Sequence, residues 1–362
     1  MVQAPPTPQL LADASLAERI RAFVEPRAAA VDACQLSLRD GLAFLHESGL
    51  LDVGIYGRDT ASDFERLCEV TATIAQFDMS QAFSLWCHRT CIEYLNRAAP
   101  DSWLRTDLLP EVLEARRLGS TAFAAGMANF LGGAPLPVTF RRDGDDLIAN
   151  GRIVWASNLE APFVSVTAAV NEDDPDDRLV FAFTEANGVD IPRGPELLAL
   201  QSTASSSAAF DEVRIPAHQI LTEDFEGFVR CVLPTFITVQ SSFCWGLTSR
   251  ALAEAERGLT GQREILRDDF EALATRAREA EATLRAFART EDRTTIEPRE
   301  LLALRLEWGT LCVAAVALEA KVAGGRGYML HSDTARRMRE AAFLPVQAPT
   351  EVQLRWLLSR SA

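Results

Sequence analysis

The spacing of hydrophobic residues changes twice along the chain, and this change limits the folds that are possible. Up to about residue 117, apolar residues recur three and four positions apart, as in amphipathic helices. From about 118 to 225 they form short alternating runs, and after about 226 helical spacing returns over longer segments. Because helical and strand segments are separated along the chain, we expect a multidomain α+β fold. The expected domains are a helical domain (1–117), a β domain (118–225) and a second helical domain (226–362).

Two segments of the first region illustrate the helical pattern. In residues 38–51, leucines recur at near-helical spacing, and Gly49 follows them at a position that suits a helix end. Residues 79–95 read MSQAFSLWCHRTCIEYL and are apolar nearly all round. A helix with no polar face is normally covered on every side, so we expect this one to be buried between other helices.

The middle region has the pattern of an antiparallel sheet. Asp143-Gly144 and Asn150-Gly151 each separate short runs of alternating apolar residues, which is the strongest short-range signal for a hairpin. Three more alternating runs follow without a helical segment between them, namely FVSVTAAV, DRLVFAFTEA and SSSAAFDEVRIP. Strands at this spacing predict an antiparallel β-barrel or β-sandwich.

The last region has the pattern of a helical bundle. Between Leu266 and Phe287, apolar residues alternate steps of four and three positions, which is the seam of a bundle helix. A further helix is expected to begin near Pro298, because proline suits an early helical position, and to end at Gly324-Gly325. We therefore expect a C-terminal four-helix bundle.

Charge and hydropathy exclude several classes of partner. The formal net charge is −15, which argues against nucleic acid or an anionic membrane as the main partner. We find no apolar run that approaches the roughly 20 residues needed to span a bilayer. The first residues, MVQAPPTPQLLADASL, lack the basic start and apolar core of a signal peptide. We expect a cytoplasmic protein without a membrane span.

Cysteine and histidine are too scattered to predict a metal site. The seven cysteines show no framework spacing, and most lie among apolar residues, where they read as small buried hydrophobes. Cys87-His88 with Cys91 resembles half of a zinc site, but no second pair of ligands matches it. Because a closed zinc site needs four ligands, we expect no metal.

Four motifs occur in a fixed order along the chain. They are HESGLLDVGIYG, NGRIVWASN, STASSSAAFDEVRIPAHQIL and GGRGYMLHSDTARRMREA. Their order on a helix–β–helix layout resembles the acyl-CoA dehydrogenase family of flavoproteins, over nearly the whole chain. In that family the second motif corresponds to a Trp-x-Thr/Ser-Asn segment, and the fourth to a Gly-Gly-x-Gly-Tyr turn and an Arg-Asp-Ala helix.

The resemblance implies a flavin, FAD or FMN, between the β domain and the bundle. Trp155 would lie against the isoalloxazine ring, with the Ser157 hydroxyl facing its N5 region. Ala125 belongs to AAGMANFLGG, which replaces the family's Thr-Glu-Pro-Gly-x-Gly-Ser-Asp flavin cradle. The expected contacts of the pyrophosphate are Gly324, Gly325, Gly327 and Thr350. From the residues alone, the reading of Trp155 as a core residue of a strand is favoured. The glycines can form a helix end and a turn as well as a phosphate contact.

The family's catalytic glutamate has no counterpart in this chain. An ungapped alignment of MREAAFLPVQAPTE places Ala348 at that position and Pro349 on the glycine that follows it. The alternative base position of some subfamilies falls on Phe236 and Ile237. Glu351 could supply a carboxylate from three residues further on, or it could simply complement the dipole of a helix N-terminus. Ala348 keeps a backbone N–H that could polarise a carbonyl.

Three functions remain open on this evidence. The first is a flavin-dependent oxidoreductase that removes two hydrogens from an acyl thioester, with an unusual base. The second is a reduced-flavin-dependent monooxygenase on the same fold, which needs no base for the α-proton. The third is a non-catalytic relative that has kept the scaffold. The family's Arg-Lys-x-Phe-Gly motif, which reaches the neighbouring subunit's FAD, is absent, but the resemblance still implies a homodimer or homotetramer.

Overall fold

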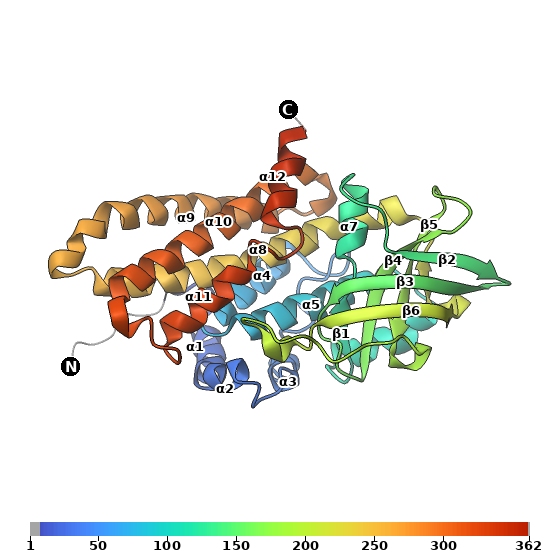
Figure 1. Ribbon diagram of the computed structural model, residues 1–362, viewed down its shortest axis with the longest axis horizontal. Helices are drawn as coiled ribbons and strands as arrows, with labels where there is room; N and C mark the ends of the chain where they lie inside the picture. The colour runs from blue at the N-terminus through green and yellow to red at the C-terminus, as the bar shows by residue number, and fades with distance from the viewer. Residues whose placement is uncertain (1–7, 361–362) are drawn as a thin grey trace.

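The computed structural model describes residues 8–360, and it has a helical part and a β part (Figure 1). The sheet lies at the right of the view, and the long helices extend from it to the left. The first residues, 1–7, on which part of the signal-peptide prediction rests, lie outside the described residues. The helical, β and helical segments follow one another as the hydrophobic spacing predicts.

The N-terminal part is made of six short and medium helices. They are α1 (Ala14–Val24), α2 (Ala28–Asp32), α3 (Arg39–Glu47), α4 (Ala61–Ala75), α5 (Met79–Leu95) and α6 (Leu109–Leu113). A capping box starts α4, in which Thr60 and Asp63 each accept a hydrogen bond from the other's backbone N–H. Every residue of α5 is buried, which confirms the prediction made for residues 79–95.

A single mixed sheet forms the middle of the chain. Its strands are β1 (Leu118–Thr121), β2 (Val138–Asp143), β3 (Asp146–Ala156), β4 (Phe163–Asn171), β5 (Arg178–Thr184), β6 (Ser206–Ile215) and β7 (Ile220–Thr222). Their order is β6-β3-β2-β4-β5-β7, and β1 pairs with β4. The prediction of a purely antiparallel sheet is wrong, because β4 runs parallel to both β1 and β2. Turn signals report only strands joined by tight turns, whereas parallel neighbours are joined by long connections.

The two hairpin predictions have different outcomes. Asp143 pairs with Asp146 across the β2–β3 turn, and Gly144 has a φ of +64°, so the first hairpin is confirmed. The hairpin expected at Asn150-Gly151 is wrong, because β3 continues through both residues. Gly151 has a φ of +123° at a register shift between β3 and β6, which is a β-bulge. Turns and bulges can both require a residue with a positive φ, so an Asn-Gly pair is compatible with either structure.

The C-terminal part is a bundle around one long helix. Its helices are α8 (Phe225–Gly258), α9 (Arg267–Ala288), α10 (Pro298–Ala323), α11 (Asp333–Phe343) and α12 (Glu351–Arg360). Helices α8, α9, α10 and α11 pack against one another, and α4 packs against α8 as well. The starts of β1 and α8 fall where the hydrophobic spacing changes; the division into three domains remains a prediction.

Helix α10 corrects one expectation drawn from hydropathy. The segment Pro298–Arg326 is long and apolar enough, by length and composition, to cross a membrane, so the statement that no run approaches this length is wrong. The side chains of α10 pack instead against α8, α9 and α11. Trp308 and Leu311 are fully buried, as in the central helix of a bundle.

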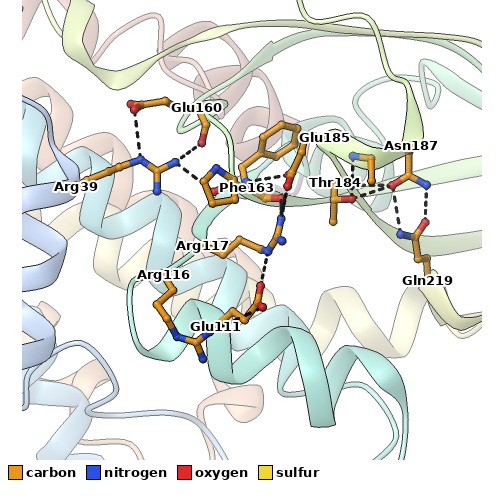
Figure 2. Close-up of polar contacts among 12 residues, drawn as sticks. Arg39, Glu111, Arg116, Arg117, Glu160, Phe163, Thr184, Glu185, Asn187 and Gln219 are labelled. Atoms are coloured by element: carbon orange, nitrogen blue, oxygen red, sulfur yellow. Dashed lines mark hydrogen bonds and ion pairs between the residues drawn. The ribbon is translucent and has the colours of Figure 1, made fainter.

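Ion pairs join the N-terminal helices to the sheet (Figure 2). Arg39 of α3 donates to the Glu160 carboxylate over 3.3 Å and to the carbonyl of the same residue, just before β4. Arg117 bridges Glu111 of α6 and Glu185 after β5, each at 2.8 Å. These contacts join the sheet to the N-terminal helices.

Candidate active site

A cavity of about 470 Å³ lies where the sheet meets the helices. The end of β3, the middle of α5, α8 and the segment after α11 form its wall, together with the loop before β6. We call it the Trp155 cavity, and its lining residues are Phe83, Trp86, Cys87, Thr121, Ala124, Trp155, Ala156, Ser157, Leu197, Leu198, Ala199, Leu200, Thr203, Ser205, Phe236, Arg339, Ala342, Phe343, Val346, Gln347 and Ala348. Most of these side chains are apolar, as in sites that take small organic ligands.

Trp155 is not a core residue. Its side chain is 55% exposed, although a strict alternation from Ile153 would bury it. The register between β3 and β6 shifts between Ile153 and Ala156, so that Val154 and Trp155 are both exposed and Ala156 is buried. The core-residue reading of Trp155 is therefore wrong, and the indole forms part of the cavity wall.

Three of the four hydroxyl groups that line the cavity form a hydrogen-bonded chain. The Ser157 and Ser205 Oγ atoms are 2.7 Å apart, and Thr203 Oγ1 is 2.7 Å from Ser205 Oγ. The buried Asn158 side chain holds the end of β3 in place, because it accepts a hydrogen bond from Ser84 and donates to the Gly119 carbonyl. These hydroxyls offer donors and acceptors to a ligand in an otherwise apolar wall.

Ala348 lines the same cavity. A cis peptide bond joins it to Pro349, and its carbonyl accepts a hydrogen bond of 2.9 Å from Gln240 Nε2. Among the described residues that line the cavity, none carries a carboxylate or an imidazole, and the charged one is Arg339. This cavity therefore has no lining side chain suited to remove a proton from carbon.

The glycine turn after α10 lies at the other end of α8. Gly327 lines a separate, charged cavity of about 340 Å³ together with Gly258, and Gly324 has a φ of +62°. Phe236 of the Trp155 cavity and Gly258 lie on one helix, about 33 Å apart at a rise of about 1.5 Å per residue. The expectation that Trp155 and the glycine turn meet in space to hold one flavin is therefore wrong for the described chain, because α8 holds them apart.

The arrangement of the whole chain matches solved structures closely. An acyl-CoA dehydrogenase from Geobacillus kaustophilus superposes with a TM-score of 0.84, at 15% identity and with 96% of each chain covered. The chain has the acyl-CoA dehydrogenase fold. A structure described as an FAD-dependent dehydrogenase gives a TM-score of 0.81 at 16% identity, again with 96% of each chain covered.

Sequence comparisons agree with this fold. No protein-family model matches the chain. Among curated proteins, the chain is similar to the "probable acyl-CoA dehydrogenase FadE2" of Mycobacterium tuberculosis, with 26% identity over 167 residues. That match spans about 40% of this chain and 40% of the length of the relative. The resemblance to acyl-CoA dehydrogenases indicated by the four motifs is confirmed.

Five of the predicted site residues lie on the wall of neither cavity just described, namely Ala125, Gly324, Gly325, Thr350 and Glu351. Ala125 is half-buried on α7 (Ala124–Phe130), next to the lining residue Ala124. Thr350 caps α12, since its Oγ1 accepts from the Gln353 backbone and its N–H donates to Gln353 Oε1. Glu351 starts α12 and pairs with Arg355 at 2.7 Å. A place at the helix N-terminus accounts for Glu351 without catalysis.

The partial zinc motif on α5 has a structural role. His88 Nε2 lies 2.8 Å from the Val112 carbonyl, and its Nδ1 accepts from the Gly119 N–H at 2.9 Å. Burial lowers the pKa of His88 to about 4, so the ring is neutral at physiological pH. Cys87 lines the Trp155 cavity, but burial raises the pKa of its thiol well above its usual value. A buried neutral thiol of this kind is a poor nucleophile.

Within the acyl-CoA dehydrogenase fold, several lining residues had no sequence signal. Residues 197–200 line the cavity, but their sequence matches none of the four motifs. Gln347 lies directly before Ala348, and nothing in the sequence distinguishes it from other polar residues. The fold alone brings these residues together, from the loop before β6 and from the segment after α11. Buried polar residues beside an apolar cavity are recognised only when their partners are known.

Proposed function

We propose that the protein is a flavin-dependent oxidoreductase that holds the flavin ring of FAD in the Trp155 cavity and acts on an acyl thioester. The reaction would be α,β-dehydrogenation, with the flavin as hydride acceptor. The observation that carries the proposal is the indole of Trp155, 55% exposed on the wall of an apolar cavity in an acyl-CoA dehydrogenase fold. A large apolar surface at this point is costly unless a ligand covers it.

The residues present fit a flavin. A tricyclic aromatic ring is bound best by a flat aromatic surface with a few hydrogen-bonding groups at its edge. Trp155 would supply the surface, and the hydroxyls of Ser157, Thr203 and Ser205 would supply donors along one edge. FAD is preferred over FMN because a structure with a TM-score of 0.81 is described as FAD-dependent.

An acyl thioester is the substrate class that the named relatives favour. The remaining wall of the cavity is apolar and aromatic, from Phe83, Phe236 and Phe343, and these rings would exclude water from an acyl chain. Arg339, the charged lining residue, would remain available to a polar group near the opening. Chain length does not follow from these contacts.

The missing carboxylate limits the rate that this site could reach. A positioned general base contributes typically about 10²–10⁴-fold. Ala348 can offer only backbone groups, and its carbonyl already accepts a hydrogen bond from Gln240. We therefore propose a slow dehydrogenation, in which a base from solution, rather than a lining side chain, takes the α-proton at the thioester end of the substrate.

Two copies of the chain would be needed if the glycine turn also serves the cofactor. Because α8 separates Trp155 from Gly327 within one chain, the turn could reach a flavin only from a second subunit. We propose a homodimer or homotetramer for this reason, and a cytoplasmic location consistent with the acidic composition. The exposed residues Tyr328, Met329 and Leu330 directly after the turn favour a contact there.

A reduced-flavin-dependent monooxygenase is the second candidate. The observation in its favour is that the described lining residues include no carboxylate, since oxygen activation needs no base for the α-proton. Oxygen uptake that depends on supplied reduced flavin and on an added organic substrate would support it. Without such uptake, this candidate is removed.

The visible absorption spectrum of the purified protein tests the main proposal. We expect the bands of bound flavin, and a loss of the long-wavelength band when an acyl-CoA is added without oxygen. A protein that remains colourless after incubation with excess FAD would overturn flavin binding. A yellow protein that no acyl-CoA bleaches, over hours and across chain lengths, would overturn the dehydrogenase reaction alone.

A further inference from the structure

A buried arginine without a carboxylate partner lies behind the Trp155 cavity. Arg305 of α10 is 1% exposed, and among the described residues the partners of its guanidinium are neutral oxygens. Its guanidinium donates to Gln240 Oε1 at 3.0 Å, to the Leu344 carbonyl at 3.0 Å and to Gln347 Oε1 at 3.2 Å. A buried charge is normally paired, so a cation balanced only by neutral oxygens needs an explanation.

The arginine fixes the orientation of both glutamine amides. Arg305 has donors only, so the oxygen of each amide must face it and the nitrogen must point away. Gln240 uses its nitrogen to donate to the Ala348 carbonyl at 2.9 Å. Gln347 is 5% exposed and lines the cavity, but its Nε2 has no hydrogen-bond partner. One amide is thus fully satisfied, and its neighbour keeps an unused donor.

The unused donor differs from an ordinary unsatisfied group in its electrostatics. The charge of Arg305 polarises the Gln347 amide, which makes its N–H groups stronger donors. The Nε2 atom is also shielded from solvent, so water does not satisfy it. The terminal torsion of glutamine is broad, so a small rotation can bring Nε2 to the cavity surface while Oε1 still accepts from Arg305.

We propose that Gln347 recognises a hydrogen-bond acceptor of the ligand, and that Arg305 acts as its positioning residue. The acceptor class is a carbonyl oxygen, or the same oxygen as it gains negative charge. This deepens the proposed function and rests on it for the choice of an acyl thioester. The site next to Ala348 would thus have a donor toward a carbonyl, where the resemblance implies a proton acceptor.

A pair of matched ligands tests this. The probes are the octanoyl thioester of N-acetylcysteamine and the corresponding S-octyl thioether, which lacks only the carbonyl of the chain. Their dissociation constants are measured by calorimetry on the protein as purified. One net hydrogen bond corresponds to about a 3- to 10-fold difference in affinity, so we expect the thioester to bind more tightly by that factor.

Two variants locate the difference at Gln347. Gln347→Met removes the donor with little change in volume, and Gln347→Glu removes it while keeping an oxygen for Arg305. In both, the ratio of the two affinities should fall to about one. Gln353→Met, on the neighbouring helix α12 and outside the Trp155 cavity, should keep the ratio of the native protein. Melting temperatures of all variants are measured to show that they are folded.

The outcomes separate this inference from flavin binding. Equal affinities for the two probes in the native protein would overturn it, as would a preference that survives in Gln347→Met. Failure of both probes to bind would overturn it too. The flavin content of the same samples, read from the absorption spectrum, reports on the proposed function independently of either probe.

Discussion

Glu319 and Arg337 form an ion pair that is almost completely shielded from water. Their shortest N–O distance is 2.6 Å, and their side chains are 2% and 5% exposed. The pair joins α10 to α11 on either side of the glycine turn, and Thr334 donates a further hydrogen bond of 2.6 Å to Glu319. The position of the turn therefore depends on this contact.

Replacement of Glu319 should destabilise the protein strongly. Glu319→Ala leaves the Arg337 guanidinium buried without its partner, and we expect a loss of about 3–5 kcal/mol in the free energy of unfolding. Urea denaturation measures it. Glu351→Ala removes an ion pair with the exposed Arg355 and should cost less than about 1 kcal/mol. Similar losses in both variants would contradict the assigned importance of the buried pair.

Close packing of α4 against α8 gives a second prediction. A Cβ added at Gly246 would lie 2.0 Å from the Ala72 carbonyl oxygen, so the helices would have to move apart. We expect Gly246→Ala to lower the free energy of unfolding by about 1–3 kcal/mol. Gly325→Ala is the matched control, because a Cβ there meets nothing within 4 Å. A neutral Gly246→Ala would show that α4 and α8 are more loosely packed than described.

Two buried carboxyls give a dependence of stability on pH. Burial raises the pKa of Glu340 to about 7 and that of Asp78 to about 6, although Arg336 lowers both. Because the folded protein holds these protons more tightly than the unfolded chain, stability falls as the pH rises from about 4 toward these values.

Glu340→Gln removes one of these titrating groups. We expect its melting temperature, relative to the native protein, to be higher at pH 8 than at pH 5. Glu340 lies 3.6 Å from Arg336, whose other acidic partner Asp333 remains in place. A difference that does not change with pH would mean that Glu340 is already charged in the folded protein.

Trp155 should matter for the cofactor and little for stability. Because the indole is 55% exposed, Trp155→Ala should change the free energy of unfolding by less than about 1 kcal/mol. We expect the same variant to lose most of its flavin, as measured by absorbance per protein. Trp245, which is 1% exposed, is the control, and Trp245→Ala should cost about 3–5 kcal/mol. Full flavin content in Trp155→Ala would remove the indole from the proposed site.

Introduction of a carboxylate at residue 348 should raise the dehydrogenation rate. Ala348 lines the cavity, and Ala348→Glu would place an acid where a thioester is expected to bind. A positioned base contributes about 10²–10⁴-fold, so we expect at least about 10-fold faster anaerobic bleaching of the flavin by acyl-CoA. Ala348→Gln has nearly the same size without a base and should show no increase. Equal rates in both variants would contradict this role of the position.

The sequence predicted the helices and strands better than it predicted which of them lie close together in the fold. Periodicity identified α5 as a buried helix, because a segment without a polar face has to be covered on all sides. The Asn150-Gly151 signal failed, since local backbone preference does not distinguish a turn from a bulge opposite β6. The separation of Trp155 from Gly327 depends on the length of α8, and motif order alone contains no distance.

The Trp155 cavity also depends on which face of β3 carries the tryptophan. Two residues, Val154 and Trp155, point outward in succession only because the strand loses its alternation before Ala156. Deletion of Val154 would restore regular alternation with the tryptophan still outward, because one outward position would then lie between Ile153 and Ala156. Homologous chains can therefore keep this wall with or without the extra residue, provided that the tryptophan falls in the outward phase of the strand, and a motif alone does not record that phase.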